Sequence, residues 1–115
     1  MQNLRYAEML QDSAGEARER ERVALDRSIM MMELATSADA TPADIAGAIL
    51  FTTKLWTVLI EDLAAPDNGL PRELRAQLVS IGIWILKELE RVRNGDAASF
   101  DDLIEVSRAI QKGLL

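Results

Sequence analysis

The chain has 115 residues, 49% of them hydrophobic, which is enough for one domain with its own core and too apolar for a disordered chain. It contains no cysteine and no histidine, which excludes disulfides, thiol nucleophiles and the commonest metal ligand. Thirteen basic against nineteen acidic residues leave a formal net charge of -6, which disfavours broad contact with nucleic acid or anionic lipid. We therefore expect a single domain over residues 1–115 that uses no cofactor.

The amino-terminal part of the chain predicts one long helix with room for a short one before it. Ser13 and Glu16 have the spacing of a capping box, in which the serine hydroxyl caps the amide of Glu16 and the carboxylate reaches back. The helix that they open covers about residues 14–35. A further short helix over about residues 3–11 fits the spacing of the apolar residues there.

Three more helices are bounded by capping and breaking residues. Thr41-Pro42 supplies a cap and then a proline at the first helical position, where its missing N–H costs nothing. Pro71 opens the next helix, Gly95 provides the left-handed residue that ends it, and Ser99 caps the last one. The expected ranges are about 42–64, 71–93 and 100–112. The sequence therefore predicts an all-α fold, a small bundle of four main helices.

In the segment Leu78–Leu86 every second residue is β-branched, in the manner of a strand: Val79, Ile81, Ile83 and Ile85. It lies inside the long helical stretch that begins at Pro71, and the chain offers no second run of this kind for it to pair with. A lone strand would leave its backbone groups unsatisfied. We therefore predict helix for this segment.

On a helical wheel each predicted helix has one apolar face, which on the second helix begins at Ile45. More apolar side chains are present than these four faces hold. Either the central helices are buried on two sides, or the surplus forms a surface for a partner helix or a second copy of the chain. The surplus residues that we predict to bind a partner are Val79, Ile83, Leu86, Leu50, Phe51, Val58, Met30 and Leu34.

Residues with catalytic potential are few and are not grouped. Glu61 and Asp62 are neighbours that point about 100° apart on a helix, and Asp101 and Asp102 lie where a helix dipole favours acids. No glycine-rich phosphate loop accompanies them, and the arginines between residues 18 and 27 alternate with acids. We therefore expect no catalytic residue, no metal site and no direct binding of nucleic acid.

The block WTVLIEDLA followed by NGLP, within the run Lys54–Glu88, resembles the centre of the FlaF family of flagellar biosynthesis regulators. The closing segment FDDLIEVSRAIQKGL (Phe100–Leu114) fits the same family. The resemblance implies a cytoplasmic protein that binds flagellin, promotes its synthesis and export, and acts in opposition to a companion regulator, FlbT. It assigns no binding role to single positions.

We expect the helical termini of flagellin to lie in an apolar groove of this bundle, which would cover them before export. Two alternatives remain at this point: a post-transcriptional regulator that acts on flagellin mRNA directly or with FlbT, and a homodimeric structural adaptor. We expect a cytoplasmic location and no membrane contact, because the longest charge-free stretch, Ala76–Leu86, is too short to cross a bilayer.

Overall fold

The computed structural model describes residues 2–96 and 99–114, and the side chains of residues 15–96 and 99–113. Within these residues all regular structure is α-helical, so the predicted all-α bundle is confirmed. The four helices are α1 (Gln2–Thr36), α2 (Pro42–Ala64), α3 (Arg72–Arg93) and α4 (Asp101–Leu114).

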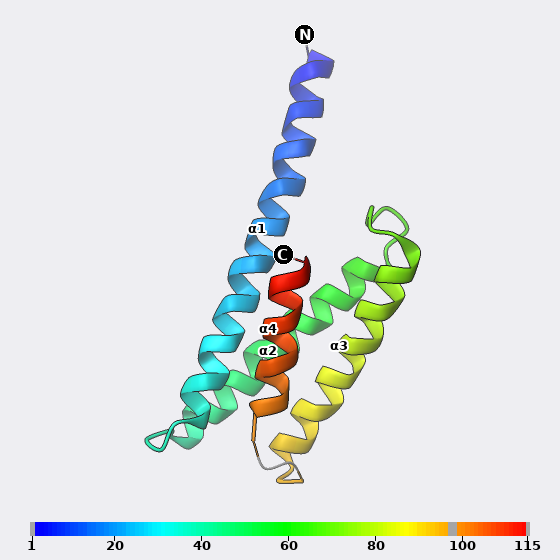
Figure 1. The fold of residues 1–115 in the computed structure, drawn as a ribbon. Helices are drawn as coiled ribbons and strands as arrows, with labels where there is room; N and C mark the ends of the chain where they lie inside the picture. The colour runs from blue at the N-terminus through cyan, green and yellow to red at the C-terminus, as the bar shows by residue number, and fades with distance from the viewer. Residues whose placement is uncertain (1, 97–98, 115) are drawn as a thin grey trace.

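Helix α1 is uninterrupted, so the predicted short first helix and the cap at Ser13 are both wrong. The residues around Ser13 include no proline, and Gly15 costs a helix only about 1 kcal/mol, which does not break it. At 1.5 Å per residue, α1 is about 52 Å long and sets the longest dimension of the molecule, 57 Å. Its amino-terminal part continues beyond the ends of the other helices (Figure 1).

The predicted helix boundaries are set by local hydrogen bonds. Thr41 Oγ1 accepts from the N–H of Asp44 at 3.1 Å, and the N–H of Thr41 donates to Asp44 Oδ2 at 2.9 Å, which completes a capping box. Gly95 has a φ of 79° and follows the end of α3, as predicted. Ser99 Oγ accepts from the N–H of Asp101 at 3.3 Å, and α4 begins at Asp101, one residue later than predicted.

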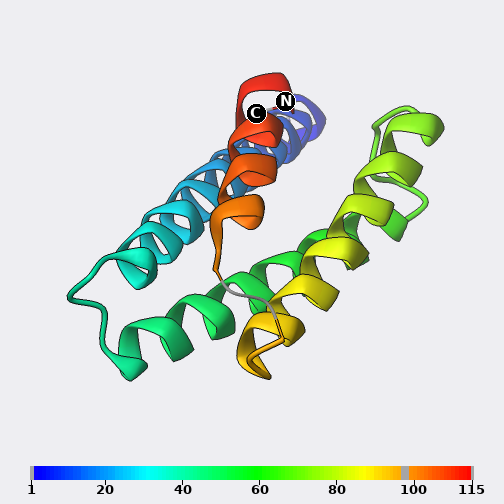
Figure 2. The same cartoon turned by 60° about the horizontal axis from the view of Figure 1, so that its bottom comes forward.

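The helices run up and down, and α2 packs against both α1 and α3. Helix α4 lies between α1 and α3 in both views (Figures 1 and 2). It packs chiefly on α1 and has much less direct contact with α3. Two polar contacts join it to α1: an ion pair between Arg108 and Glu33, and a hydrogen bond of 3.1 Å from Gln111 Nε2 to Asp26 Oδ1.

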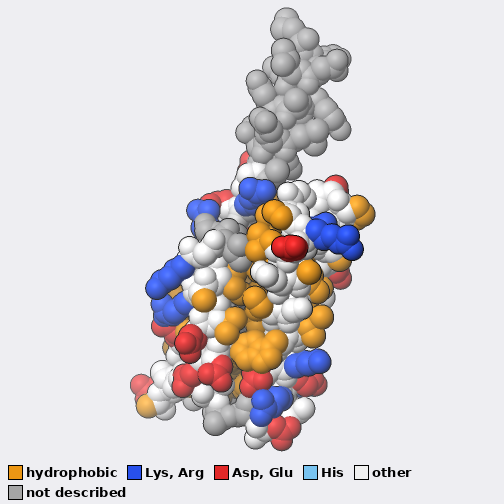
Figure 3. Space-filling view, turned by 45° about the vertical axis from the view of Figure 1, so that its right-hand side comes forward, with side chains coloured by type: hydrophobic (Ala, Val, Ile, Leu, Met, Phe, Trp, Pro, Cys, Tyr) orange, Lys and Arg blue, Asp and Glu red, His pale blue; other side chains and the backbone are white. Residues whose placement is uncertain are grey.

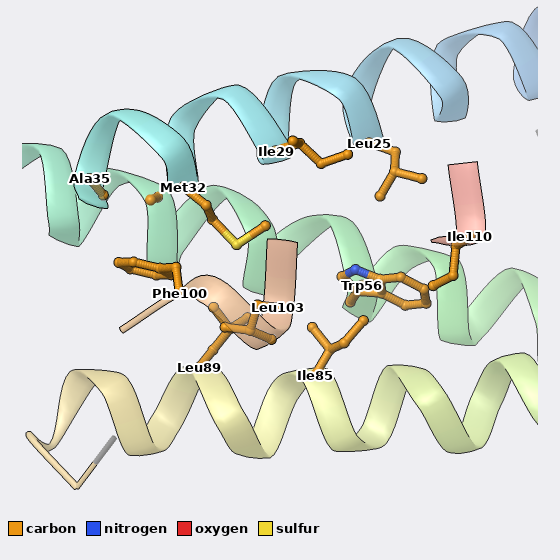
Figure 4. Close-up of a cluster of buried hydrophobic side chains, with 11 residues drawn as sticks. Leu25, Ile29, Met32, Ala35, Trp56, Ile85, Leu89, Phe100, Leu103 and Ile110 are labelled. Carbon is orange, nitrogen blue, oxygen red and sulfur yellow. The ribbon is translucent and has the colours of Figure 1, made fainter. Parts of the chain in front are cut away.

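All four helices contribute to one hydrophobic core, and their buried positions follow the predicted apolar faces. Figure 4 shows side chains from the different helices directed toward one another. The segment Leu78–Leu86 is helical, as predicted, with Leu78 and Ile85 buried. Ile45 is the exception, because it lies in the first turn of α2, at the edge of the bundle, and is exposed. The buried hydrophobic cluster is Leu25, Ile29, Met32, Ala35, Ala48, Trp56, Ile85, Leu89, Phe100, Leu103 and Ile110.

Candidate binding surface

A groove runs along the outer side of the α2–α3 pair. It consists of two hollows of about 460 and 240 Å³ that share Ile49, Thr53 and Arg93. On α2 the lining extends from Pro42 to Thr57. At 1.5 Å per residue this is about 23 Å, or four turns of a partner helix.

The structure places two of the predicted residues in the lining of this α2–α3 groove. Leu50, which is 58% exposed, and Leu86, which is half-buried against the core cluster, line the two hollows. Ile83, 44% exposed, lies one turn before Leu86 on α3, and Val79 lies one turn further and is half-buried. Burial on two sides therefore applies in part to Val79 and Leu86, whereas Leu50 and Ile83 present free apolar surface.

Phe51 lies in a different groove, between α1 and α2. This hollow of about 550 Å³ is lined on the α1 side by residues that include Val23 and Arg27. The guanidinium carbon of Arg27 is 5.1 Å from the centroid of the Phe51 ring, a cation–π contact that covers part of the ring. Val58, two turns along α2, is exposed. Leu50 and Phe51, which are neighbours on α2, thus line different grooves, because successive side chains of a helix point about 100° apart.

Met30 and Leu34 form a third apolar area, on the outer face of α1. Met30 is 63% exposed, and Val23 and Leu34 are exposed at helical spacing on the same face. The structure therefore distributes the eight predicted residues over three neighbouring surfaces. The α2–α3 groove is the longest of these, with Leu50 exposed in its lining on α2 and Ile83 exposed one turn before its lining residue Leu86 on α3.

Among the described side chains, three exposed large apolar residues were not predicted to bind a partner: Val23, which lines the groove beside Phe51, Ile45 and Trp84. Ile45 was assigned to the core and instead lines the α2–α3 groove, because that part of α2 is the outermost turn. Trp84 is 37% exposed on α3. Figure 3, which brings the α3 side of the molecule forward, shows hydrophobic side chains gathered in a band along that face. The sparse contact between α3 and α4 explains this exposure, and the sequence contains no signal for it.

A separate cavity of about 340 Å³ opens at the end of the bundle where α1 extends past the other helices. Its rim includes Glu21 from α1 and Asp62 from α2. Burial raises the pKa of Glu21, the charge of Asp62 raises it further, and Arg18 and Arg20 act in the opposite direction. Sequence reasoning missed this cavity because its two carboxylates come from separate helices.

Helix α2 is long and apolar enough to cross a membrane by length and composition alone. Its composition reflects both its central position, with α1 and α3 packed against it, and its exposed residues Leu50 and Val58. Central helices of bundles often meet the same criterion. The expected absence of membrane contact stays a prediction.

Comparison with known proteins yields one family. The model of the flagellar protein FlaF matches residues 2–114. The chain belongs to the FlaF family. The resemblance is thereby confirmed over nearly all of the chain, which is accordingly a flagellar protein. No curated protein and no solved structure matches it.

The family is described as that of a flagellar protein, and this description names no reaction. Among the described residues, no group of three or more histidine, cysteine or acidic side chains could hold a metal ion. The described part of this FlaF-family chain offers apolar grooves and the cavity at the end of the bundle as surfaces for binding.

Proposed function

We propose that this FlaF-family protein is a cytoplasmic export chaperone and positive regulator that binds the amphipathic terminal helices of flagellin in the α2–α3 groove. The observation that carries the proposal is the exposure of two large aliphatic side chains on the helices that form the groove: Leu50, which lines it on α2, and Ile83, which lies one turn before the lining residue Leu86 on α3. A monomer gains no stability from such exposure, whereas an apolar partner helix would bury both.

The groove suits a helix better than an extended chain. Its lining of about four turns can accept partner side chains at i, i+3, i+4 and i+7. Glu90 and Arg93 line the second hollow and form an exposed salt bridge with each other at 2.5 Å, so this end of the groove carries little net charge. The groove therefore does not require a strongly charged partner.

Binding to purified flagellin tests the proposal. We expect the double substitution Leu50→Glu with Ile83→Glu to weaken flagellin binding about a hundredfold or more, because both charges would be buried under the bound helix. The matched control is Ala76→Glu with Ala109→Glu, which adds the same charges at exposed positions outside the three apolar surfaces and should bind flagellin normally. Isothermal calorimetry measures both affinities, and circular dichroism checks that each variant is folded.

Two results would contradict the groove as the flagellin site. One is equal binding of the two double variants. The other is a wild-type dimer that the Leu50→Glu and Ile83→Glu variant converts to a monomer in light scattering, because the groove would then be a contact between copies. Co-elution with FlbT in the presence and absence of flagellin tests the further expectation that FlbT joins the complex.

A further inference from the structure

The cavity at the end of the bundle has an apolar floor and an acidic rim. Leu25 from α1, Trp56 from α2 and Ile110 from α4 form part of the floor, and Figure 4 shows these three side chains directed toward one another. The rim contains Glu21, Asp62, Asp67, Asn68 and the cation Arg18. Three carboxylates against one guanidinium leave a local excess of negative charge.

The carboxylate of Asp62 is held in place on this rim. Asn68 Nδ2 donates to Asp62 Oδ2 at 3.1 Å and to the backbone carbonyl of Asp62 at 3.1 Å. These bonds tie the loop after α2 to the end of that helix and fix Asp62 beside Glu21. Among the described side chains, neither Glu21 nor Asp62 is in a salt bridge.

This arrangement is unfavourable in the free protein. Partial burial and the neighbouring Asp62 both oppose ionisation of Glu21 and raise its pKa. A cation placed between the two carboxylates would remove the repulsion, and an apolar group in the cavity would cover the floor. The charge of the rim and the apolar floor of the cavity therefore both suit a ligand that carries one cationic group and one apolar group.

We propose that the cavity binds two side chains of a basic amphipathic helix of a partner protein: a large aliphatic or aromatic side chain that enters the cavity, and a lysine or arginine one turn away that lies between Glu21 and Asp62. The amino-terminal part of α1 continues past the cavity and offers a backbone alongside which such a helix can lie (Figure 1). The formal net charge of -6 favours the approach of a cationic partner. The inference depends neither on the α2–α3 groove nor on flagellin.

Synthetic peptides test the cavity without flagellin. The probe is a helical peptide of about 20 residues, since shorter isolated helices are marginal in water. It carries leucines along one face with lysines one turn away, and a second peptide has glutamates in place of the lysines. The protein carries Trp84→Phe, so that Trp56 in the cavity floor is its only tryptophan and reports occupancy by fluorescence.

We expect the lysine peptide to shift Trp56 emission and to bind about tenfold or more tightly than the glutamate peptide. Glu21→Gln with Asp62→Asn should weaken the lysine peptide about tenfold. Glu61→Gln with Glu105→Gln, which removes the same charge from positions outside the cavity lining, should leave its affinity unchanged. Ala17→Leu, which fills the cavity and keeps its charges, should also weaken it.

Three results would overturn the proposal: no shift of Trp56 emission with the lysine peptide, equal affinity for both peptides, or equal affinity of the two charge variants for the lysine peptide. Normal binding by Ala17→Leu would show that the leucine does not enter the cavity and would overturn it as well. Flagellin is absent from this experiment. A negative result would therefore overturn the peptide site in the cavity, and the proposed chaperone function would still be decided by the flagellin-binding experiment.

Discussion

Gly82 in α3 lies so close to Ile60 in α2 that a Cβ atom added to the glycine would stand 2.9 Å from Ile60 Cγ1. The same atom would lie 2.9 Å from Cε3 of Trp56, a side chain of the hydrophobic core. Helices α2 and α3 therefore pack closely at a point where only a glycine fits. The close approach joins the two helices that carry the groove and packs Gly82 against Trp56.

The first prediction follows from this close approach. Gly82→Ala should destabilise the protein by about 1–3 kcal/mol through overpacking, although alanine favours a helix by about 1 kcal/mol over glycine. Gly47→Ala is the matched control, because its Cβ would meet Met31 Cε at an ordinary 3.7 Å. Urea denaturation followed by circular dichroism measures both. Equal stability of the two variants would show that α2 and α3 separate without cost.

The second prediction concerns pH and Glu21. Because its pKa is raised on folding, the folded protein binds the proton more tightly, and ionisation of Glu21 lowers stability as pH rises above the usual value of 4.5. Glu21→Gln should therefore be more stable than the wild type at pH 7, and the difference should shrink as pH falls toward 4.5. Melting temperatures across this range test it, with Glu61→Gln as the exposed control.

A gain that persists unchanged at low pH would contradict this account, since Glu21 is then protonated in both the folded and unfolded protein. The direction of the stability change in Glu21→Gln also distinguishes a structural role of Glu21 from a role in binding. A residue that destabilises the free protein and is needed for peptide binding would be retained for binding.

The third prediction asks what holds α4 in place. The ion pair between Arg108 and Glu33 is exposed, so Arg108→Ala should cost only about 0–1 kcal/mol. Leu103 is completely buried in the core, so Leu103→Ala should cost about 2–5 kcal/mol. Chemical denaturation of both variants tests the contrast. If Arg108→Ala were the more damaging change, α4 would depend on its polar contact with α1 and not on the core.

Part of the fold could be predicted from residues that are close in sequence. The helix cap at Thr41, the glycine stop at Gly95 and the helical state of Leu78–Leu86 depend on interactions within a few residues, and all three were predicted. The helix start predicted at Ser13 was wrong, because a capping signal inside a run of helix-forming residues is not sufficient to interrupt the helix.

The candidate surface was less predictable. A helical wheel identified Leu50, Val58 and Met30 as outside the core, and they are exposed. It could not separate Ile83, which is exposed, from Leu86, which is half-buried, because that difference depends on how α2 packs against α3.

By itself the sequence determined the four apolar faces, the boundaries of α2, α3 and α4 to within one or two residues, and the surplus of apolar side chains, because these follow from helical periodicity and capping. The tertiary structure alone decided which surplus residues share a groove, where Gly82 lets two helices approach, and that Glu21 meets Asp62 at a cavity. Those relations join residues distant in the chain, and only the packing of the helices brings them together.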